Sequence, residues 1–537
     1  MNKTMFSMGS DAPIKSSNAP FQIVENGKSN YALIFPQDAS ATVLFAVDMI
    51  RMAIQTKTGV RLWIDSDNLR GKPAHDPNQR AILFGKTNYE ESQKVLDTLG
   101  KFEYKIEQVG NKLVIAAHDD SYVLEAAKYY VAHLLEPNLC GEEGDKTLSS
   151  DEYHFVQDPT TLGNLYINGK PITEFSIVYP RENERYQEIA KRLQSTILDC
   201  TGVELPLYAD AKNETENEIL IGKTSRSFSR RLYQDQNQRF MTYSLEVSGN
   251  KLQLFSGGYA SAARAVEDMR FSVFGATPVS YTDGSYEKND LLPEARPLAD
   301  EADIRIISTN ILLERWDVEN RDDEEYRAEL LAGMLLRYKP DAAGIQEAGG
   351  GWLISLEKIL SLLKEDFNIE YTWCHKYVRG VENYSSILYR SDLYDCVKAD
   401  YHIFSYWKSQ NYQMRIITWC KLRSKTDSTK QFILMNTHWD TYEQNKYLDA
   451  DESAVLLNNL KNEGCPVFYT GDFNSQPGVP WLTNFINATD VKALDKAPTV
   501  DYIFYCGDGV TAKQHGVMHG FMAMSDHTPR FTDFKIR

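Results

Sequence analysis

The sequence predicts a mixed fold of the α+β and α/β classes, in which two small homologous α/β domains precede a larger domain of two packed sheets. Two observations predict this fold. The first part of the chain repeats its own motifs, and residues 302–537 carry many short β-rich runs and few helices. The 537 residues suffice for several domains, because a single core stops growing at roughly 250–300 residues.

The repeat is visible in two pairs of segments. AILFGKTN at 81–88 matches EILIGKTS at 218–225, and VGNKLVI at 109–115 matches SGNKLQL at 248–254. The offsets of 137 and 139 residues are nearly constant, which indicates a duplicated unit rather than coincidence. After a polar segment that is predicted to be disordered, the sequence therefore predicts two homologous domains. The predicted segment and domains span 1–20, 21–160 and 161–285.

Each copy is predicted to contain the same elements. A helix ends at a Thr-Gly pair, where glycine supplies the left-handed cap. Short strands and a hairpin follow, and the hairpin of the first copy turns at Gly110-Asn111. A second helix closes each copy. The expected helices span 41–57, 121–135, 185–200 and 259–273.

The pattern of ILIGKT, a hairpin and an Ala-rich helix resembles the small non-catalytic α/β domain that precedes the barrel in family 20 glycoside hydrolases. The resemblance covers 21–157 and 162–285, and it implies a fold rather than an activity. The Gly-Lys-Thr of both copies does not complete a phosphate loop. That motif needs glycine five positions earlier, where this chain has Arg80 and Asn217.

A polar, Pro-containing stretch at 286–301 is predicted to be a linker. In the domain predicted beyond it, at 302–537, several apolar runs end on carboxylate, amide or imidazole side chains. Loops that leave the ends of strands can converge on one cleft. The sequence therefore predicts two sheets with helices outside and a polar site at the strand ends.

Glu347 ends the apolar run DAAGIQ, where an unpaired buried carboxylate would be costly. A cation removes this cost, and Mg²⁺ typically takes one or two carboxylates and keeps several waters. Asp526 is the natural second ligand. A structural salt bridge is the alternative for either acid.

Asp472 and Asn474 lie two residues apart, so in extended backbone both side chains point to one face. A carboxylate acceptor beside an amide donor suits the orientation of an attacking water and a hydrogen bond to a phosphate oxygen. The alternative is an Asp-Asn turn, since these residues often bond their own backbone.

Two histidines follow similar patterns. His527 has a side chain that exchanges protons near neutral pH, and Asp501 is the candidate that orients it. His438, at the end of another apolar run, is placed to donate to a phosphate oxygen or to protonate a leaving group. A purely structural histidine is the alternative for His438.

The ordered polar residues of 302–537 resemble the endonuclease/exonuclease/phosphatase superfamily. The set comprises Asn310, Glu347, His438, Asp472, Asn474, Asp501, Asp526 and His527. The resemblance implies a four-layer α/β/β/α sandwich and Mg²⁺-dependent hydrolysis of phosphoric esters, with Mn²⁺ as the alternative ion.

The same resemblance implies a role for individual residues. Glu347 binds the metal, assisted by Asn310 and Asp526. Asp472 positions the water, Asn474 holds a phosphate oxygen, and Asp501 orients His527. Three further residues fall where such relatives contact substrate: Arg415, Asn383 and Tyr384.

The charge balance limits the substrate. The formal net charge is −17, and residues 300–537 hold 35 acidic and 26 basic side chains. Proteins that bind long nucleic acids neutralise phosphates with Lys and Arg, so this balance disfavours nucleic acid. A small or lipid-like phosphate ester is the expected substrate, and the repeats are candidates for contact with a glycan or a protein.

Seven scattered cysteines without CxxC spacing predict reduced, mostly buried thiols rather than a disulfide framework or a zinc site. The N-terminal segment lacks the apolar core of a signal peptide, and no run approaches about 18 apolar residues. These features predict a cytoplasmic protein, or an extracellular one if a leader has been removed.

Three hypotheses for the function follow. The first is a metal-dependent hydrolase of phosphomonoesters or phosphodiesters. The second is a metal-dependent nuclease, and the third is a non-enzymatic protein that binds a glycan or a partner.

Overall fold

The computed structural model describes most of the chain. The described residues are 21–67, 78–236, 240–290, 296–312, 324–349, 351–378, 381–382, 385–406, 415–494, 499–518, 524–525 and 527–536. They form two compact units, the first containing the described residues up to 290 and the second those from 296 onward. None of the described helices is both long enough and apolar enough to cross a membrane.

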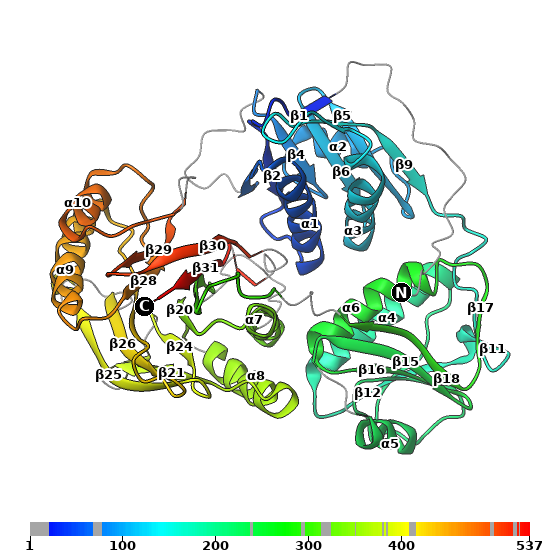
Figure 1. Cartoon of the computed structure of the whole chain (residues 1–537). Coiled ribbons are helices and arrows are strands. Elements are labelled where there is room, and N and C mark those ends of the chain that lie inside the picture. The colour runs from blue at the N-terminus through cyan, green and yellow to red at the C-terminus, as the bar shows by residue number, and fades with distance from the viewer. Residues whose placement is uncertain are drawn as a thin grey trace. The chain divides into compact units, whose positions relative to one another are not determined.

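The first unit contains two six-stranded sheets (Figure 1). The first sheet has the order β3-β2-β4-β6-β5-β9. These strands span Trp63–Ser66, Ala32–Phe35, Ala81–Phe84, Lys112–Ala117, Glu103–Val109 and Tyr153–Val156. Its helices are α1 (Ala41–Thr58), α2 (Glu90–Leu96) and α3 (Asp120–Tyr129), which continues into the π-helix η1 (Tyr130–Leu135).

The second sheet of this unit has the order β13-β12-β14-β16-β15-β18. These strands span Leu207–Ala209, Ser176–Tyr179, Glu218–Ile221, Lys251–Ser256, Thr242–Ser248 and Gly284–Asp290. Its helices are α4 (Glu184–Thr201), α5 (Ser227–Asp235) and α6 (Tyr259–Ser272). Residues 286–290, which the sequence assigns to the linker, lie in β18.

Two small sheets complete the first unit. One has the order β1-β8-β7, with strands Phe21–Val24, Thr147–Ser150 and Leu139–Cys140. The other has the order β11-β10-β17, with strands Lys170–Pro171, Leu165–Ile167 and Val279–Tyr281, and a 3₁₀-helix η2 (Ile172–Glu174) follows β11.

The two larger sheets of the first unit share one pattern of pairing. When the strands of each sheet are numbered in chain order, both sheets have the same strand order. Corresponding pairs of strands are also parallel or antiparallel in the same way. The glycines Gly59 and Gly202 end α1 and α4 with φ of 76° and 74°, as the Thr-Gly pairs predict. A glycine with positive φ also follows β4 and β14, so each Gly-Lys-Thr lies in a turn after a strand. An origin by duplication stays a prediction.

The second unit is built on two larger sheets. The six-stranded sheet has the order β21-β24-β20-β19-β31-β30, with strands Tyr371–Cys374, Ile387–Arg390, Ala342–Gln346, Ile304–Asn310, Arg530–Lys535 and Thr511–Val517. The five-stranded sheet has the order β25-β26-β27-β28-β29, with strands Tyr394–Ile403, Ile416–Ser424, Gln431–His438, Val467–Asp472 and Asp501–Cys506. A short hairpin pairs β22 (Tyr377–Val378) with β23 (Val381–Glu382).

Helices cover the outer face of each of these sheets (Figure 1). The helices α7 (Glu324–Tyr338) and α8 (Gly351–Phe367) pack together on the six-stranded sheet. The helices α9 (Glu443–Lys461) and α10 (Pro480–Thr489) pack together on the five-stranded sheet. The second unit is therefore the four-layer α/β/β/α sandwich that the sequence predicts.

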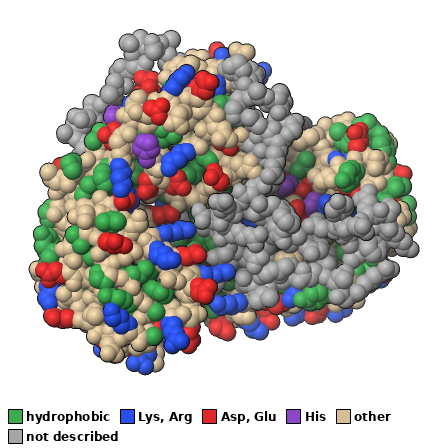
Figure 2. Space-filling model, turned by 180° about the vertical axis from the view of Figure 1, so that it is seen from behind, with side chains coloured by type: hydrophobic (Ala, Val, Ile, Leu, Met, Phe, Trp, Pro, Cys, Tyr) green, Lys and Arg blue, Asp and Glu red, His purple; other side chains and the backbone are tan. Residues whose placement is uncertain are grey.

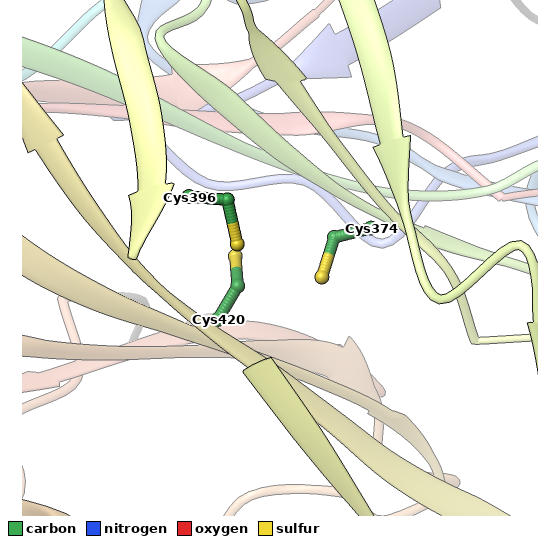
Figure 3. A group of neighbouring side chains, drawn as sticks. All are labelled: Cys374, Cys396 and Cys420. Atoms are coloured by element: carbon green, nitrogen blue, oxygen red, sulfur yellow. The ribbon is translucent and has the colours of Figure 1, made fainter. Parts of the chain in front are cut away.

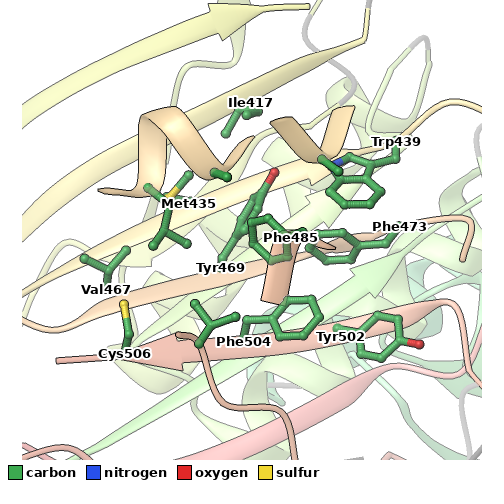
Figure 4. Packing of buried hydrophobic residues seen from close by; sticks show 14 of the residues in the cluster. Ile417, Met435, Trp439, Val467, Tyr469, Phe473, Phe485, Tyr502, Phe504 and Cys506 are labelled. Carbon is green, nitrogen blue, oxygen red and sulfur yellow. The ribbon is translucent and has the colours of Figure 1, made fainter. Parts of the chain in front are cut away.

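Two apolar cores hold these layers together. Between the sheets, Ile306, Phe468 and Phe534 belong to one buried cluster. Beneath α9 and α10, the rings of Trp439 and Phe473 lie in a second cluster, with ring centroids 4.8 Å apart (Figure 4). Strands such as β28 are buried on both faces, which explains why their sequences are continuous apolar runs rather than alternating ones.

A buried polar contact joins the two sheets near the ends of their central strands. The amide nitrogen of Asn436 in β27 donates to the carbonyl oxygens of Ile345 and Ser386, at 3.0 and 2.9 Å. Its amide oxygen accepts from Gln346 Nε2 at 2.6 Å and from Thr470 Oγ1 at 3.1 Å. Since buried polar groups are costly when unpaired, these bonds fix the separation and the register of the two sheets.

Gly344 in β20 leaves room for this contact. A Cβ atom there would lie 2.0 Å from Thr470 Oγ1 and 2.4 Å from Asn436 Oδ1. The two sheets can approach this closely only where one of them carries no side chain.

Gly344→Ala is expected to lower the free energy of unfolding of the second unit by about 1–3 kcal/mol, because the added methyl group overpacks the contact. Urea unfolding followed by circular dichroism measures the effect. Gly516→Ala, on the edge strand β30, is the matched control, because its Cβ would come no closer than 3.1 Å to Phe531. Equal midpoints for the two variants would contradict this account.

A buried carboxylate, that of Asp449, lies in the second turn of α9. Asp449 accepts hydrogen bonds from the Tyr406 hydroxyl and, at 2.9 Å, from the backbone N–H of Asp440. Asp440 in turn accepts from Asn445 Nδ2 at 2.8 Å and from the N–H of Tyr442 at 3.1 Å. Burial raises the pKa of Asp449 to about 7.

This raised pKa makes stability depend on pH. Below the ordinary value of 3.8 both the folded and the unfolded states are protonated; above it the unfolded chain loses the proton first. Stability is therefore lost as pH rises toward about 7. Asp449→Asn removes this titration. Between roughly pH 5 and pH 8, the free energy of unfolding of the wild type should therefore fall by about 2 kcal/mol more than that of the variant. Urea unfolding at both pH values tests this, with Asp451→Asn, at an exposed position of the same helix, as the control.

Candidate active site

The predicted site residues meet at one end of the sandwich. Asn310, His438 and Asp472 are the last residues of β19, β27 and β28, and Glu347 follows β20 directly. Asp501 begins β29, which runs antiparallel to β28, so it lies opposite Asp472. The strand pairing therefore brings these five positions to one edge, although they are far apart in the sequence.

Asn310 connects the carboxylates of the two sheets. Its Nδ2 donates to Glu347 Oε1 at 2.9 Å and to Asp472 Oδ2 at 3.2 Å. Glu347 has a left-handed backbone, with φ of 63°, a conformation that a residue with a Cβ adopts only where the surroundings hold it. This backbone turns the chain at the end of β20.

His527 is hydrogen-bonded to Asp501. Its Nδ1 lies 3.0 and 3.1 Å from the two carboxylate oxygens of Asp501, and its Nε2 lies 3.7 Å from Asp472 Oδ2. A carboxylate at Nδ1 holds that nitrogen as the donor, so Nε2 is the nitrogen turned toward Asp472. The pair has the geometry predicted for it.

His438 is buried beside the same carboxylates. Its Nε2 lies 3.4 Å from Asp472 Oδ2, and its Nδ1 lies 3.8 Å from Glu347 Oε1. Burial, with the nearby charges of Arg415 and His527, lowers the pKa of His438 well below its usual range. His438 is therefore neutral near pH 7 and offers one donor and one acceptor.

Asp472 is the most deeply enclosed acid of the site. Burial raises its pKa to about 6; the charge of His527 lowers it and that of Asp501 raises it. Its Oδ1 accepts from the backbone N–H of Asn474 at 2.8 Å. Asp472 is thus mostly ionised at neutral pH, and its pKa lies near the range where a carboxylate exchanges protons.

Asn474 does not lie in extended backbone, so the premise of the first interpretation is wrong and the alternative, an Asp-Asn turn, is what the structure shows. β28 ends at Asp472, and Asn474 has φ of 46° in the turn that the Asp472 carboxylate caps. The amide nitrogen of Asn474 donates to the carbonyl oxygen of Trp439 at 2.9 Å. The side chain ties the β28 turn to the residue after β27.

Three other side chains support the site and were not assigned by the sequence. Ser525 donates from Oγ to the carbonyl oxygen of Asn310 at 2.6 Å, and its Oγ accepts from the N–H of His527 at 3.1 Å. Arg327 in α7 donates from Nε to the carbonyl oxygen of Met524 at 2.7 Å. Lys446 in α9 donates from Nζ to the carbonyl oxygen of Asn474. Only Ser525 carried a sequence signal, because it directly precedes Asp526 and His527.

The remaining predicted residues are Arg415, Asp526, Asn383 and Tyr384. The guanidinium of Arg415 lies beside the site, with Nη1 3.5 Å from the carbonyl oxygen of His438. Asp526, Asn383 and Tyr384 lie outside the described residues.

The described part of the chain offers a group of oxygen and nitrogen ligands at this site. The ligand atoms of Asp472, Asp501 and His527 all lie within 4.8 Å of one another, close enough to share a metal ion. Glu347 reaches the same end of the sandwich through its bond with Asn310. The site thus gathers three carboxylates, two imidazoles and the amide of Asn310 at one end of the sandwich.

Comparison with known proteins gives a family match for part of the chain. Residues 307–527, or 221 of the 537 residues, match the profile of the Endonuclease/Exonuclease/phosphatase family. By its name this family contains nucleases and phosphatases, which cleave phosphoric esters. No curated protein resembles the sequence closely enough to count as a match.

Solved structures similar to this chain cover the same region. An endonuclease/exonuclease/phosphatase from Bacteroides vulgatus is 20% identical, with a TM-score of 0.37 over 44% of this chain and 99% of its own. A mannosyl-6-phosphatase of Bacteroides thetaiotaomicron is 19% identical, with a TM-score of 0.36 over 43% and 99%. The catalytic domain of human Nocturnin, with bound sulfate, is 18% identical, with a TM-score of 0.37 over 45% and 97%.

Proposed function

We propose that the second unit is a divalent-metal-dependent hydrolase of phosphoric esters that directs a water molecule onto phosphorus. The observation that carries this proposal is the hydrogen-bonded link Glu347–Asn310–Asp472 across the two sheets, beside the Asp501–His527 pair. No single strand end would supply more than one of these groups. The fold therefore brings carboxylates, an imidazole and an amide donor together in one site.

The residues fit a hard divalent cation, with Mg²⁺ as the proposed ion and Mn²⁺ as the alternative. Carboxylate and amide oxygens are the ligands that Mg²⁺ prefers. Because Asp501 and His527 are bonded to each other, we assign the cation to Glu347 and Asn310, with Asp526 as a further ligand. When bound, the cation would neutralise charge that develops on the phosphoryl oxygens.

The chain's own residues would then divide the remaining work. The ionised Asp472 accepts a hydrogen bond from the attacking water and orients it, and its pKa near 6 suits proton acceptance near neutral pH. The neutral His438 donates an N–H to a phosphate oxygen. His527, held by Asp501, presents Nε2 toward the same point and stabilises negative charge when protonated.

The proposed substrate is a small or lipid-like phosphate ester. The acidic balance of residues 300–537 argues against long nucleic acid, whose binding relies on clustered Lys and Arg. Figure 2 shows acidic and basic side chains interspersed over the described surface of one face of the molecule. We also propose that the first unit contacts a glycan or a protein, and we assign no particular residue to that contact.

The test is turnover of a panel of phosphate esters with Mg²⁺, comprising sugar phosphates, nucleotides, inositol phosphates, phospholipids, plasmid, single-stranded DNA and RNA. We expect turnover of at least one small or lipid ester and none of the polymers. Cleavage of plasmid or RNA alone would replace the proposed substrate with a nucleic acid. No turnover with any metal would leave the binding-protein hypothesis in its place.

Asp472→Asn is expected to lower kcat by at least about 100-fold, because the amide cannot accept the proton of the water. Asp440→Asn is the matched control: Asp440 follows His438 by two residues, but its carboxylate accepts bonds from Tyr442 and Asn445 at the start of α9. That variant should lose about 1 kcal/mol of stability and keep its kcat. Equal losses of kcat in both variants would contradict the assigned role.

Asp501→Asn and His527→Gln are expected to act as one unit. Each should lower kcat by about 10²- to 10⁴-fold, and the double variant should lose little more than the worse single variant. A double-mutant cycle on the best substrate measures this, with His515→Gln, at an exposed position of β30, as the control. Multiplicative losses would show that the two side chains work independently.

A further inference from the structure

Three cysteines converge in the second unit, away from the candidate active site. Cys374 is the last residue of β21, the edge strand of the six-stranded sheet. Cys396 lies on β25, the edge strand of the five-stranded sheet, and Cys420 lies on the adjacent strand β26. Their Sγ atoms all lie within 4.8 Å of one another, and Figure 3 shows the three side chains pointing toward one space. We call these residues the thiol cluster.

The backbone of β25 departs from regular pairing at this point. Cys396 lies opposite Leu422 and Lys398 lies opposite Lys421, so Val397 is an extra residue in the strand. A bulge of this kind re-aims the neighbouring side chain. Here Cys396 packs against the core between the sheets, while Val397 is exposed.

The cluster differs from the ordinary packing of single cysteines. A buried cysteine usually acts as a small apolar side chain, and Cys374 and Cys420 do belong to the core between the sheets. Three thiols from three strands and two sheets nevertheless meet, whereas the other four cysteines of the chain belong to no such group among the described residues. All seven are free thiols.

The spacing of the sulfurs matches a shared metal ion. Zinc–sulfur bonds are about 2.3 Å long, so two thiolates on one tetrahedral ion lie about 3.8 Å apart. The sulfur atoms already lie within 4.8 Å of one another. Side-chain rotations that move each sulfur by about an ångström would bring them to that spacing. Soft thiolates select Zn²⁺ and Cu⁺ over hard ions such as Mg²⁺.

We propose that Cys374, Cys396 and Cys420 bind one thiophilic d¹⁰ cation of the zinc class and that this ion ties the edges of the two sheets together. The thiols lose their protons to the solvent as the ion binds. Cys396 is the partly exposed member and gives the ion its route of entry. The fourth coordination position is left to water, because no fourth His, Cys, Asp or Glu of the described residues joins the group.

This site is distinct from the candidate active site. Cys420 lies opposite Leu434, and His438 follows four residues later on β27, about 13 Å along the strand. The donors also differ, since the candidate active site offers oxygen and imidazole nitrogen while the cluster offers sulfur alone. An assay that detects metal–sulfur bonds therefore reports on the cluster only.

The test is a titration of the metal-free full chain with Co²⁺ and then Zn²⁺, without oxygen and with excess Mg²⁺ present. We expect one equivalent of Co²⁺ to give thiolate-to-cobalt absorption that Zn²⁺ abolishes. Zinc should also raise the Tm of the second unit by about 5 °C. Absence of stoichiometric binding to wild type would overturn the proposal, whatever the phosphatase assays show.

The matched variants are Cys396→Ser and Cys465→Ser, since both cysteines are partly exposed and only Cys396 belongs to the cluster. Cys396→Ser should weaken cobalt binding by more than about 100-fold, because loss of an outer partner alone can cost that much. Cys465→Ser should bind as wild type does. Thiolate absorption that persists in Cys396→Ser, or a disulfide between cluster members in place of binding, would overturn the proposal.

Discussion

One buried contact sets how the two sheets of the second unit are aligned. It joins the side chain of Asn436 to Ile345, Ser386, Gln346 and Thr470. An amide buried between two sheets must be paired on both sides, so it tolerates only one register of β20 against β27 and β28. The strand ends beyond it inherit that register. Asn310 can therefore donate to Glu347 in its own sheet and to Asp472 in the other.

The candidate active site gathers negative charge in a place where charge is costly. Glu347, Asp472 and Asp501 converge at one end of the sandwich, and burial raises the pKa of Asp472 to about 6. Such an arrangement persists in folded proteins where a ligand or cation compensates the charge. The cost of gathering these carboxylates and the proposed chemistry therefore have one physical origin.

The two proposed metal sites of the second unit, the candidate active site and the thiol cluster, would use different kinds of ligand atom. Oxygen and nitrogen donors lie at the strand ends, where loops admit a substrate. Sulfur donors lie at the joined edges of the two sheets, where the thiol cluster meets the core between them. Because hard ions prefer oxygen and d¹⁰ ions prefer thiolate, one protein could hold Mg²⁺ at the strand ends and a zinc-class ion at the sheet edges without exchange between them.

Sequence alone determined the local features, because they depend on neighbouring residues. Apolar runs predicted the strands that end at Asn310, His438 and Asp472, and the Thr-Gly pairs predicted where α1 and α4 end. Tertiary structure decided what depends on distant partners. The supports from Ser525, Arg327 and Lys446 carry little or no spacing signal, since segments far apart in sequence bring these groups together. The same holds for the meeting of Cys374, Cys396 and Cys420. The seven cysteines of the sequence predicted separate thiols, and only the packing of two sheet edges made three of them neighbours.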